Sequence, residues 1–354
     1  MKILMVARRY PPDVISGTET VFENLYKQAC ARHEVRLVVG YRNDRSLVPD
    51  EAVAVDLRSG GKATRYGRLW WQTLQEIKTF QPDVVLSNSI EAPVARVPTA
   101  CIVHDLNFGK AASEGLSNKG RVWFYRAKAR KLARIITVSD AMAGQLAHQG
   151  LPQEKIVAIQ NGVDLTRFVP PTRTEADTPI QIVYPSRIIH GKGQHVAIDA
   201  VGRLPKPERR NVHLSIVGTA PDPVYLDRLK IEAYEQPVSI HVDVPDIVVW
   251  YQKADIVVFP TLMGEGFGFT AVEGMACGRP VIWSDQPAIR EATGGIGVPV
   301  PMDDAHALRQ AIRQLIDHPE ERAQLGQEGL AFVRERYDWA EVWRRYEAVL
   351  EGMR

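Results

Sequence analysis

The amino-acid sequence predicts an α/β protein made of two successive doubly wound, Rossmann-like domains. With 354 residues the chain is too long for one ordinary hydrophobic core and suits two domains. Short apolar runs alternate with longer amphipathic stretches almost from end to end, as in βαβ units. The alternation stops at a Pro- and Thr-rich stretch, residues 169–179, which is typical of a linker, and then restarts.

Six short apolar runs in the first half predict the buried strands of a parallel sheet, because helices cover such strands on both faces. These runs are residues 3–7, 35–39, 84–87, 99–103, 135–138 and 156–159. Amphipathic patterns over residues 19–32 and 68–80 predict helices between some of these strands.

Five further runs after the linker predict a second parallel sheet. They are residues 180–185, 212–217, 238–242, 256–259 and 280–283. Residues 319–353 have a helical pattern throughout, with Trp339, Trp343 and Tyr346 placed to pack. The predicted domains are therefore residues 1–168 and 169–337. Ligands of doubly wound sheets bind at the carboxyl ends of the strands, so we expect an active site in the cleft between two facing domains.

The composition is that of a soluble globular protein, with 45% hydrophobic and 24% charged residues. Three widely spaced cysteines without a CxxC pair argue against a disulfide framework and a structural zinc site, and favour the cytosol. The apolar run after Lys2 is too short for a signal peptide, and no later run reaches membrane-spanning length. Residues 1–165 carry 23 Lys and Arg against 16 Asp and Glu, and the remainder carries 21 against 26, so we expect the halves to meet different ligands.

A glycine-rich stretch after the predicted strand 256–259 carries the strongest chemical signal. Residues 264–278 read Gly-Glu-Gly-Phe-Gly-Phe-Thr-Ala-Val-Glu-Gly-Met-Ala-Cys-Gly and open a predicted helix. Glycines at a helix entrance let a ligand approach the backbone, and the N–H groups there attract a diphosphate. Glu265 and Glu273 lie eight residues apart, just over two helical turns, so one can hold sugar hydroxyls and the other a ribose.

Each of these signals also has a plain structural explanation. Carboxylates are common in the first turn of a helix because they suit its dipole, and Glu273 alone could be a surface charge. A glycine-rich turn between strand and helix is typical of dinucleotide-binding folds in general. However, the chain contains neither GxGxxG nor GxxxxGK[ST], so it lacks the phosphate loops of nicotinamide enzymes and P-loop NTPases.

The Glu-x7-Glu arrangement within residues 265–282 resembles the signature of family 4 glycosyltransferases, which have the GT-B fold. Four further segments resemble family motifs in the same order and span nearly the whole chain. They are residues 15–19 (the N-terminal glycine loop), 137–139 (a strand end), 161–168 (the interdomain segment) and 184–193 (the donor phosphate motif). The resemblance also implies that the C-terminal helix, residues 338–354, crosses back onto the first domain.

The resemblance implies a role for individual residues. Arg187 and Lys192 match the basic pair that neutralises the donor diphosphate and so replaces a metal ion. Glu265 matches the residue that contacts the donor sugar near its reacting carbon, and Glu273 matches the ribose-binding carboxylate. His104 matches the family histidine beside the sugar, although a lone histidine is more often structural. The implied donor-binding set is Gly17, Arg187, Lys192, Val244, Glu265, Gly266, Phe267, Gly268, Phe269, Thr270 and Glu273, with Glu265, His104, Arg187 and Lys192 as the catalytic residues.

Two departures from the family pattern bear on the donor. The N-terminal loop often begins Gly-Gly, but here Ser16 stands first and only Gly17 can approach a diphosphate closely. Residues 240–246, where the base is usually held by backbone groups, look shortened, and Val244 is the candidate for that contact. The expected donor is therefore a UDP-sugar, with a GDP-sugar as the alternative.

The resemblance implies a metal-independent, retaining hexosyltransferase that needs no cofactor and moves a sugar from a nucleotide-diphosphate sugar to an acceptor hydroxyl. Front-face displacement, in which the leaving phosphate helps to deprotonate the acceptor, requires no covalent nucleophile. The alternatives are a GT-B epimerase or phosphorylase-like enzyme and a sugar-binding protein without catalysis. A phosphorylase would need a pyridoxal-binding lysine, for which no context is recognisable.

The acceptor side is the least determined. Residues 119–134 carry seven Lys and Arg, no acid, and three consecutive aromatics. Such a helix suits an anionic membrane surface and hence a lipid-linked acceptor. The alternative is a solvated basic face whose aromatics pack into the first domain, with a sugar or small-molecule acceptor. We expect a cytoplasmic protein that binds no nucleic acid, with peripheral contact at the inner face of the membrane as the open question.

Overall fold

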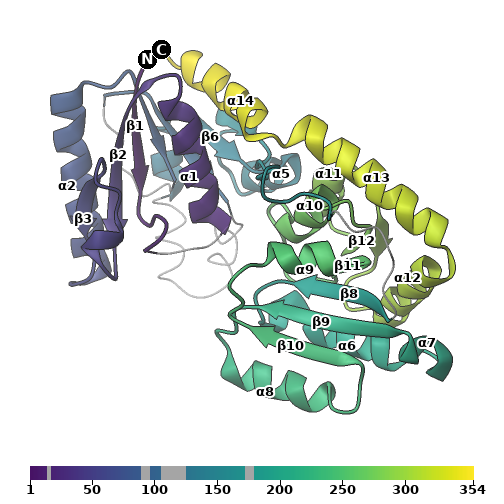
Figure 1. Ribbon diagram of the computed structural model, residues 1–354. Helices are drawn as coiled ribbons and strands as arrows, with labels where there is room; N and C mark the ends of the chain where they lie inside the picture. Colours follow the sequence, from purple (N-terminus) through teal and green to yellow (C-terminus); the bar gives the residue numbers. More distant parts are fainter. Residues whose placement is uncertain (14–16, 89–95, 105–124, 172–178) are drawn as a thin grey trace. The chain divides into compact units, whose positions relative to one another are not determined.

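The computed structural model describes residues 1–13, 17–88, 96–104, 125–171 and 179–354. The chain divides into two compact units, unit 1 (residues 1–162 and 339–354) and unit 2 (residues 163–338). Each unit is a parallel sheet flanked by helices (Figure 1). The predicted pair of doubly wound α/β sheets is therefore confirmed. No helix in the described ranges is long and apolar enough to cross a membrane.

Unit 1 contains a seven-stranded sheet with the order β3-β2-β1-β4-β5-β6-β7, and all neighbouring strands are parallel. The strands are β1 (Lys2–Ala7), β2 (Glu34–Tyr41), β3 (Val53–Asp56), β4 (Val84–Ser87), β5 (Thr99–Val103), β6 (Arg134–Thr137) and β7 (Ile156–Ala158). Five of the six residues of β1 and all residues of β4 and β5 are buried, as their apolar sequences require. The sequence pattern missed β3, a strand at the edge of the sheet in which only one of the four residues is buried.

The helices of unit 1 whose bounds lie within the described residues are α1 (Gly17–Cys30), α2 (Lys62–Phe80), α5 (Asp140–His148) and α14 (Trp339–Glu351), with single turns η1 (Arg45–Leu47) and η2 (Gln153–Lys155). Ser139 begins α5 as its N-cap, accepting a hydrogen bond from the Met142 N–H. Helix α2 packs against β2 and β3, where Leu69 and Phe80 join a buried cluster with Val55 and Leu57. It begins six residues before the predicted start at residue 68.

Unit 2 contains a six-stranded parallel sheet with the order β10-β9-β8-β11-β12-β13. The strands are β8 (Ile180–Pro185), β9 (Val212–Gly218), β10 (Val238–Val242), β11 (Ile256–Phe259), β12 (Val281–Ser284) and β13 (Val298–Val300). Their bounds match the predicted runs to within one residue, except for β13, which the sequence pattern missed. Three residues with a central proline, Pro299, do not look like a strand.

The helices of unit 2 are α6 (Gln194–Gly202), α7 (Lys206–Arg210), α8 (Pro223–Glu232), α9 (Val248–Lys253), α10 (Phe269–Ala276), α11 (Pro287–Thr293), α12 (Ala305–Asp317) and α13 (Pro319–Arg336), with the single turn η3 (His190–Lys192). Helix α12 packs on α6, and α10 packs on α13. Gly326 allows the second of these contacts, because a Cβ there would lie 2.4 Å from the Gly278 carbonyl oxygen.

The prediction of one continuous helix over residues 319–353 was wrong, because α13 ends at Arg336 and α14 begins at Trp339. The Tyr337 carbonyl accepts a hydrogen bond from the Val163 N–H at 2.8 Å, so it is withdrawn from the helical ladder. The Tyr337 side chain is buried and donates to the Ala292 carbonyl. Trp339 in turn lies against Gly162, where any Cβ would come within 2.5 Å of the indole.

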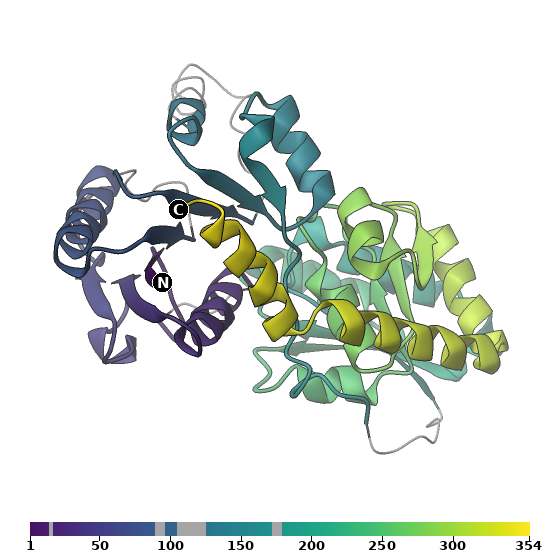
Figure 2. The same cartoon turned by 90° about the horizontal axis from the view of Figure 1, so that it is seen from above.

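Helix α14 lies beside α1 in both views (Figures 1 and 2), and its buried face consists of Trp339, Val342, Trp343, Tyr346 and Leu350. Glu347 fixes its register by pairing with Arg32 at 3.1 Å and His33 at 2.7 Å, just after α1. Asp83 accepts the Lys2 N–H on one carboxylate oxygen and the Arg354 guanidinium on the other, so it links β1 to the residues that follow α14. The terminal helix therefore completes unit 1, as the fold prediction expected.

Because Trp343 is only 1% exposed, Trp343→Ala should destabilise the protein by about 3–5 kcal/mol, the cost of an aromatic-sized cavity. The matched control is Trp71→Ala on α2, where the side chain is 58% exposed and the change should stay within about 0.5 kcal/mol. Urea unfolding followed by circular dichroism measures both. Equal stabilities for the two variants would show that α14 does not support unit 1.

Candidate active site

The candidate site in unit 2 lies at the carboxyl ends of β8, β11 and β12. Every residue of β11 and β12 is buried, so side chains that can reach a ligand occur only after these strands end. Ser186 and Arg187 follow β8, Thr261 follows β11 by two residues, and Gln286 follows β12 by two residues. The carboxyl edge of such a sheet is where doubly wound proteins bind ligands.

The central feature of this edge is an ion pair between Lys192 and Glu265. The Lys192 Nζ lies 2.6 Å from Glu265 Oε1, and the side chains are only 11% and 13% exposed. The ammonium group also lies 5.2 Å from the centre of the Phe259 ring. A pair this buried is stable only with good geometry and further hydrogen bonds, and the carboxylate has both.

Glu265 is held by two residues that sequence reasoning missed. The Thr261 hydroxyl donates to Glu265 Oε1 at 2.7 Å, and the Glu265 N–H donates to Gln286 Oε1 at 3.1 Å. The Gln286 amide nitrogen donates in turn to the carbonyls of Thr261 and Met263. Both residues are polar and come just after a buried apolar run, and this was the signal that could have identified them.

Backbone geometry brings Lys192 to this position. Gly193 has φ +74°, and a Cβ there would lie 2.4 Å from the Pro260 carbonyl oxygen, so only glycine fits. The Gly191 carbonyl accepts from the N–H groups of Leu262 and Met263, which ties η3 to the loop after β11. The buried Tyr184 hydroxyl donates to the Lys192 carbonyl. The position of the lysine is therefore fixed before any ligand binds.

Arg187 lies one loop away from Lys192, just beyond the end of β8, and its side chain is exposed. Its carbonyl accepts from the Gln194 side chain at 2.8 Å. The preceding Ser186 carbonyl oxygen lies so close to Gly218 that a Cβ there would come within 2.0 Å. The structure therefore fixes the backbone of Arg187 and leaves its guanidinium in solvent.

Helix α10 points its N-terminus at the same edge. Its N-cap is Gly268, with φ +105°, and no side chain caps the first N–H groups. The Thr270 hydroxyl donates to the Pro185 carbonyl at 2.9 Å, which joins α10 to the end of β8. Phe267 is buried against Phe269 and holds the loop, while Gly266 is half-buried. The positive end of the helix dipole adds to the charge of Arg187.

Glu273 lies on α10, just over one turn from its N-terminus, and accepts a hydrogen bond from the Tyr251 hydroxyl at 2.6 Å. Burial raises the pKa of this carboxyl to about 7, against the lowering effect of the tyrosine and of Arg167. Sequence reasoning missed Tyr251, because the spacing between α9 and α10 shows no pattern. A surface charge, the plain explanation for Glu273, does not fit these contacts.

Val244, the candidate for base contact, is half-buried between β10 and α9. The segment that follows it is tied to the start of unit 2 by Asp246, which pairs with Arg167 at 2.7 Å and accepts from the Val248 N–H. This contact with Arg167 lowers the pKa of the Asp246 carboxyl. The segment is therefore anchored just after the candidate residue.

The remaining two candidates, Gly17 and His104, belong to unit 1. The Nε2 of His104, after β5, lies 2.6 Å from Oδ1 of Asn88, after β4. The Asn88 side chain also donates to the carbonyl of Thr18, in the first turn of α1 that Gly17 begins. Asn88 is a further polar residue after a strand that the sequence reasoning missed. The departure at Ser16 lies outside the described residues.

Other sequence expectations concern metals and the membrane. In the ranges that the structure describes, no three His, Cys, Asp or Glu side chains gather as a metal site. Residues 119–124 of the basic stretch, with Trp123 and Phe124, lie outside those ranges, as does most of the expected linker 169–179. Residues 125–129 are helical, and Arg126, Arg130 and Lys131 are exposed. Metal independence and membrane contact therefore stay predictions.

Solved structures place this architecture among known folds. The chain superposes on the crystal structure of HepE from Anabaena in complex with UDP with a TM-score of 0.81, at 21% identity, covering 99% of this chain and 100% of that one. The two parallel α/β sheets and this structural similarity identify the GT-B class of glycosyltransferase folds.

The chain belongs to glycosyltransferase family 4. Models for Glycosyltransferase Family 4 and for Glycosyl transferases group 1 match residues 15–167 and 179–318. The mannosyltransferase LpcC of lipopolysaccharide core biosynthesis, from Rhizobium leguminosarum bv. viciae, is 31% identical over 58% of this chain and 60% of its own. A glycogen synthase of Mycobacterium tuberculosis is 24% identical over 97% and 92%. The chain matches only about half the length of several other curated relatives.

The raised pKa of Glu273 gives a pH-dependent stability. Native Glu273 keeps its proton up to pH about 7, whereas the unfolded chain releases it near 4.5, so deprotonation between these values favours unfolding. Relative to Glu273→Gln, the wild type should therefore lose stability from pH 4.5 to 7 and show a constant difference outside that window. Urea unfolding at a series of pH values measures the difference.

The control is Glu335→Gln, because Glu335 is exposed on α13. Its difference from the wild type should not change across the same window. A difference for Glu273→Gln that is equally flat would contradict the raised pKa.

Proposed function

We propose that this protein is a retaining glycosyltransferase that moves a hexose from a nucleotide-diphosphate sugar to an acceptor hydroxyl. The observation that carries the proposal is the buried Lys192–Glu265 pair, held at a strand-end edge beside the open N-terminus of α10. A cation, a carboxylate and a helix dipole at one edge suit a ligand that is part diphosphate and part sugar.

Charge balance explains how the diphosphate is held. Glu265 already neutralises Lys192, so the pair brings little net charge to the site. The exposed Arg187 and the positive end of α10 supply the uncompensated positive potential. An ammonium has three donors, and the hydrogen bond to Glu265 leaves Lys192 able to donate to a phosphate oxygen. As the glycosidic bond breaks, the leaving group gains negative charge where these groups are already in place.

The two glutamates take different parts of the donor. Glu265, fixed by Thr261 and Gln286, accepts hydrogen bonds from the sugar hydroxyls near the reacting carbon. Glu273, set deeper on α10 and bonded to Tyr251, accepts from the ribose hydroxyls. The backbone from Gly266 to Thr270 holds sugar and phosphate, and Val244 contacts the base. In unit 1, His104 and Gly17 serve the sugar and the diphosphate.

The proposed chemistry is a front-face displacement. The acceptor oxygen approaches the anomeric carbon from the side that the diphosphate leaves, so the configuration is retained. The departing phosphate oxygen takes the acceptor proton, and the bond from carbon to that phosphate breaks as the new bond to oxygen forms. Arg187 and Lys192 stabilise the charge on the leaving group, which is the role of a metal ion in other transferases.

The proposed donor is a UDP-sugar, with a GDP-sugar as the alternative. The structurally similar HepE was crystallised with UDP and with UDP-glucose, which supports the first choice. Release of free sugar from a panel of nucleotide sugars by the purified protein tests the activity and names the donor. A sugar-binding protein without catalysis would bind the donor and leave it intact.

Changing Arg187 or Lys192 to Ala should lower turnover by roughly 10²–10⁴-fold, the scale seen when a group that stabilises transition-state charge is removed. Arg203→Ala at the exposed end of α6 is the control and should keep near-normal turnover, because the Arg203 side chain pairs with Asp199 on the same helix and lies outside the candidate site. Activity should also persist in excess EDTA. A strict requirement for a divalent ion, or a fully active Lys192→Ala enzyme, would rule out this assignment.

The division between the glutamates is separable by calorimetry with UDP alone. Glu273→Ala should weaken UDP binding, because the nucleotide carries the ribose. Glu265→Gln should bind UDP nearly as the wild type does but lose transfer, because its partner is the sugar. Gln keeps the shape of the side chain, and its amide oxygen can still accept a hydrogen bond from Lys192. Equal losses of UDP affinity in the two variants would contradict the division.

A further inference from the structure

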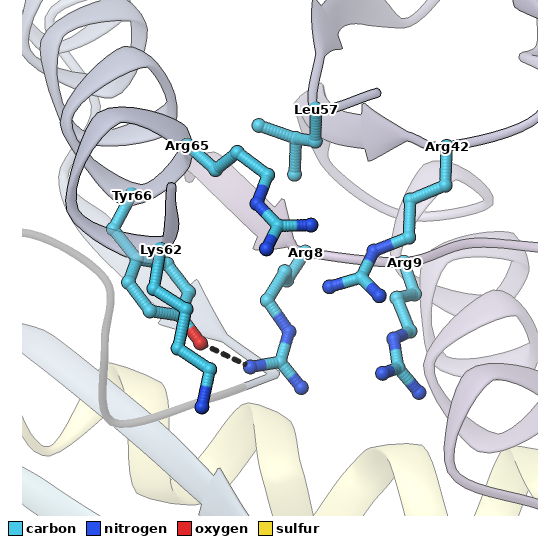
Figure 3. Close-up of a pocket in the computed structure, with 7 residues that line it drawn as sticks. All are labelled: Arg8, Arg9, Arg42, Leu57, Lys62, Arg65 and Tyr66. Atoms are coloured by element: carbon cyan, nitrogen blue, oxygen red, sulfur yellow. Dashed lines mark hydrogen bonds between the residues drawn. The ribbon is translucent and has the colours of Figure 1, made fainter. Parts of the chain in front are cut away.

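A basic hollow in unit 1 takes no part in the site described so far. It is lined by Arg8, Arg9, Arg42, Leu57, Lys62, Arg65 and Tyr66. Two of these cations follow β1, one follows β2, and two lie in the first turn of α2. Figure 3 shows the guanidinium groups of Arg8, Arg42 and Arg65 directed toward the same space. Five cations from three separate segments therefore gather at the carboxyl ends of adjacent strands.

Four of the five cations of the basic hollow have no counter-charge among the described residues. Within the described ranges, no carboxylate lies at ion-pair distance from Arg9, Arg42, Lys62 or Arg65. The neighbouring acids are engaged elsewhere. Asp13 is buried and accepts the backbone N–H groups of Arg42 and Asn43, both at 2.8 Å, and Asp56 pairs with Arg58 at 2.9 Å.

The arginines of the basic hollow also have unused hydrogen-bonding capacity. Nε of Arg9 and Nε of Arg42 are buried and have no hydrogen-bond partner among the described residues. Burial lowers the pKa of Arg42, and the charges of Arg9, Arg8 and Arg65 lower it further. Buried donors without partners and close like charges both destabilise a fold, so a role in binding is the better explanation for keeping them.

Helix α2 shows the same conflict. No acidic residue lies in its first turn, and the N-cap Gly61 offers no side chain to its N–H groups. Instead, Lys62 and Arg65 stand at the positive end of the helix dipole, where cations are unfavourable. An anion in the basic hollow would meet the dipole, the open N–H groups and the side-chain charges together.

We propose that the basic hollow binds a phosphate or diphosphate group carried by the acceptor. This proposal rests on the proposed glycosyltransferase function. Guanidinium forks match phosphate oxygens two at a time, and several converging forks suit a doubly charged group. The Tyr66 hydroxyl oxygen accepts a hydrogen bond from Arg8 at 2.7 Å. The hydroxyl hydrogen of Tyr66 therefore points away from Arg8. Buried Leu57 closes the hollow with an apolar wall.

The donor does not account for the basic hollow. Its diphosphate is assigned to Arg187, Lys192 and the N-terminus of α10 in unit 2 and to Gly17 in unit 1, and none of these groups lines the hollow. A glycosyltransferase has two substrates, the donor and the acceptor. Because the donor diphosphate already has a site, we assign the second anion site to the acceptor.

Calorimetry with inorganic pyrophosphate at low ionic strength tests the proposal on the whole chain. The Arg42→Gln/Arg65→Gln variant should lose at least tenfold in pyrophosphate affinity. Arg68→Gln is the matched control, because Arg68 lies on the same helix but donates to the carbonyls of Asp56 and Ser59, outside the hollow, and it should change affinity less than twofold. Wild-type affinity in the Arg42→Gln/Arg65→Gln variant would overturn the proposal.

Three further measurements keep the result specific. The double variant should unfold at or above the wild-type urea midpoint, because it removes repulsion. Arg42→Lys/Arg65→Lys, which keeps the charge without the forks, should bind with intermediate affinity. UDP binding should be unchanged in the double variant, and UDP should not displace pyrophosphate. If UDP displaces pyrophosphate, the hollow binds the donor and the acceptor proposal is wrong. If the wild type is inactive toward every nucleotide sugar, only the proposed glycosyltransferase function fails.

Sedimentation with vesicles then identifies the source of the phosphate. Binding to phosphatidic acid vesicles, but not to phosphatidylcholine vesicles, that is lost in the double variant would assign the hollow to a lipid-borne phosphate. Pyrophosphate binding without vesicle binding would assign it to a soluble phosphorylated acceptor. If the double variant still binds the vesicles and binds pyrophosphate with wild-type affinity, the hollow binds neither a lipid-borne nor a soluble phosphate.

Discussion

Parallel sheets that are covered on both faces leave little room for charged side chains within their central strands, and this constraint organises the whole protein. All residues of β4, β5, β11 and β12 are buried, and none of them is charged. Many of the polar groups discussed above therefore stand soon after a strand ends. Arg8 follows β1, Arg42 follows β2, Asn88 follows β4, His104 follows β5, Arg187 follows β8, Thr261 follows β11 and Gln286 follows β12. The same rule of burial thus contributes to the basic hollow in unit 1 and to the candidate site in unit 2.

Stability and function compete differently at these two places. The charges of Lys192 and Glu265 neutralise each other. Thr261 donates a hydrogen bond to the Glu265 carboxylate, and the Glu265 N–H donates to Gln286, so this edge is held by its own contacts. The cations of the basic hollow repel one another, and two of their buried nitrogens have no partner in the described part of the chain. The neutral Lys192–Glu265 pair is typical of side chains that must be held in one orientation. The uncompensated cations of the basic hollow are typical of a site that binds an anion.

Much of the fold could be predicted because burial leaves a trace in local sequence, whereas pairing between distant residues leaves none. Runs of Ile, Val and Leu located eleven strands, but only one of the four residues of β3 is buried, and β13 has three residues with Pro299 at its centre. The helix start at Lys62 was missed because Arg65 and Tyr66 do not continue the apolar period of α2. Lys192 and Glu265 were each identified from motifs, but they are 73 positions apart and their ion pair could not be foreseen. The break at Tyr337 depends on the Val163 N–H and is equally invisible in local sequence.

Because α14 packs on α1, unit 1 is assembled from segments that the ribosome produces at very different times. Residues 339–354 are made after all of unit 2, so the face of α1 that receives Trp343 and Tyr346 stays uncovered while residues 163–338 emerge. At a synthesis rate of about 5–20 residues per second, that exposure lasts roughly ten seconds or more. During this interval unit 2, whose segments are contiguous, can fold without waiting for any other part of the chain. Unit 1 is thus the last unit to reach its final form, and until then its uncovered face of α1 is an apolar surface of the kind that chaperones bind.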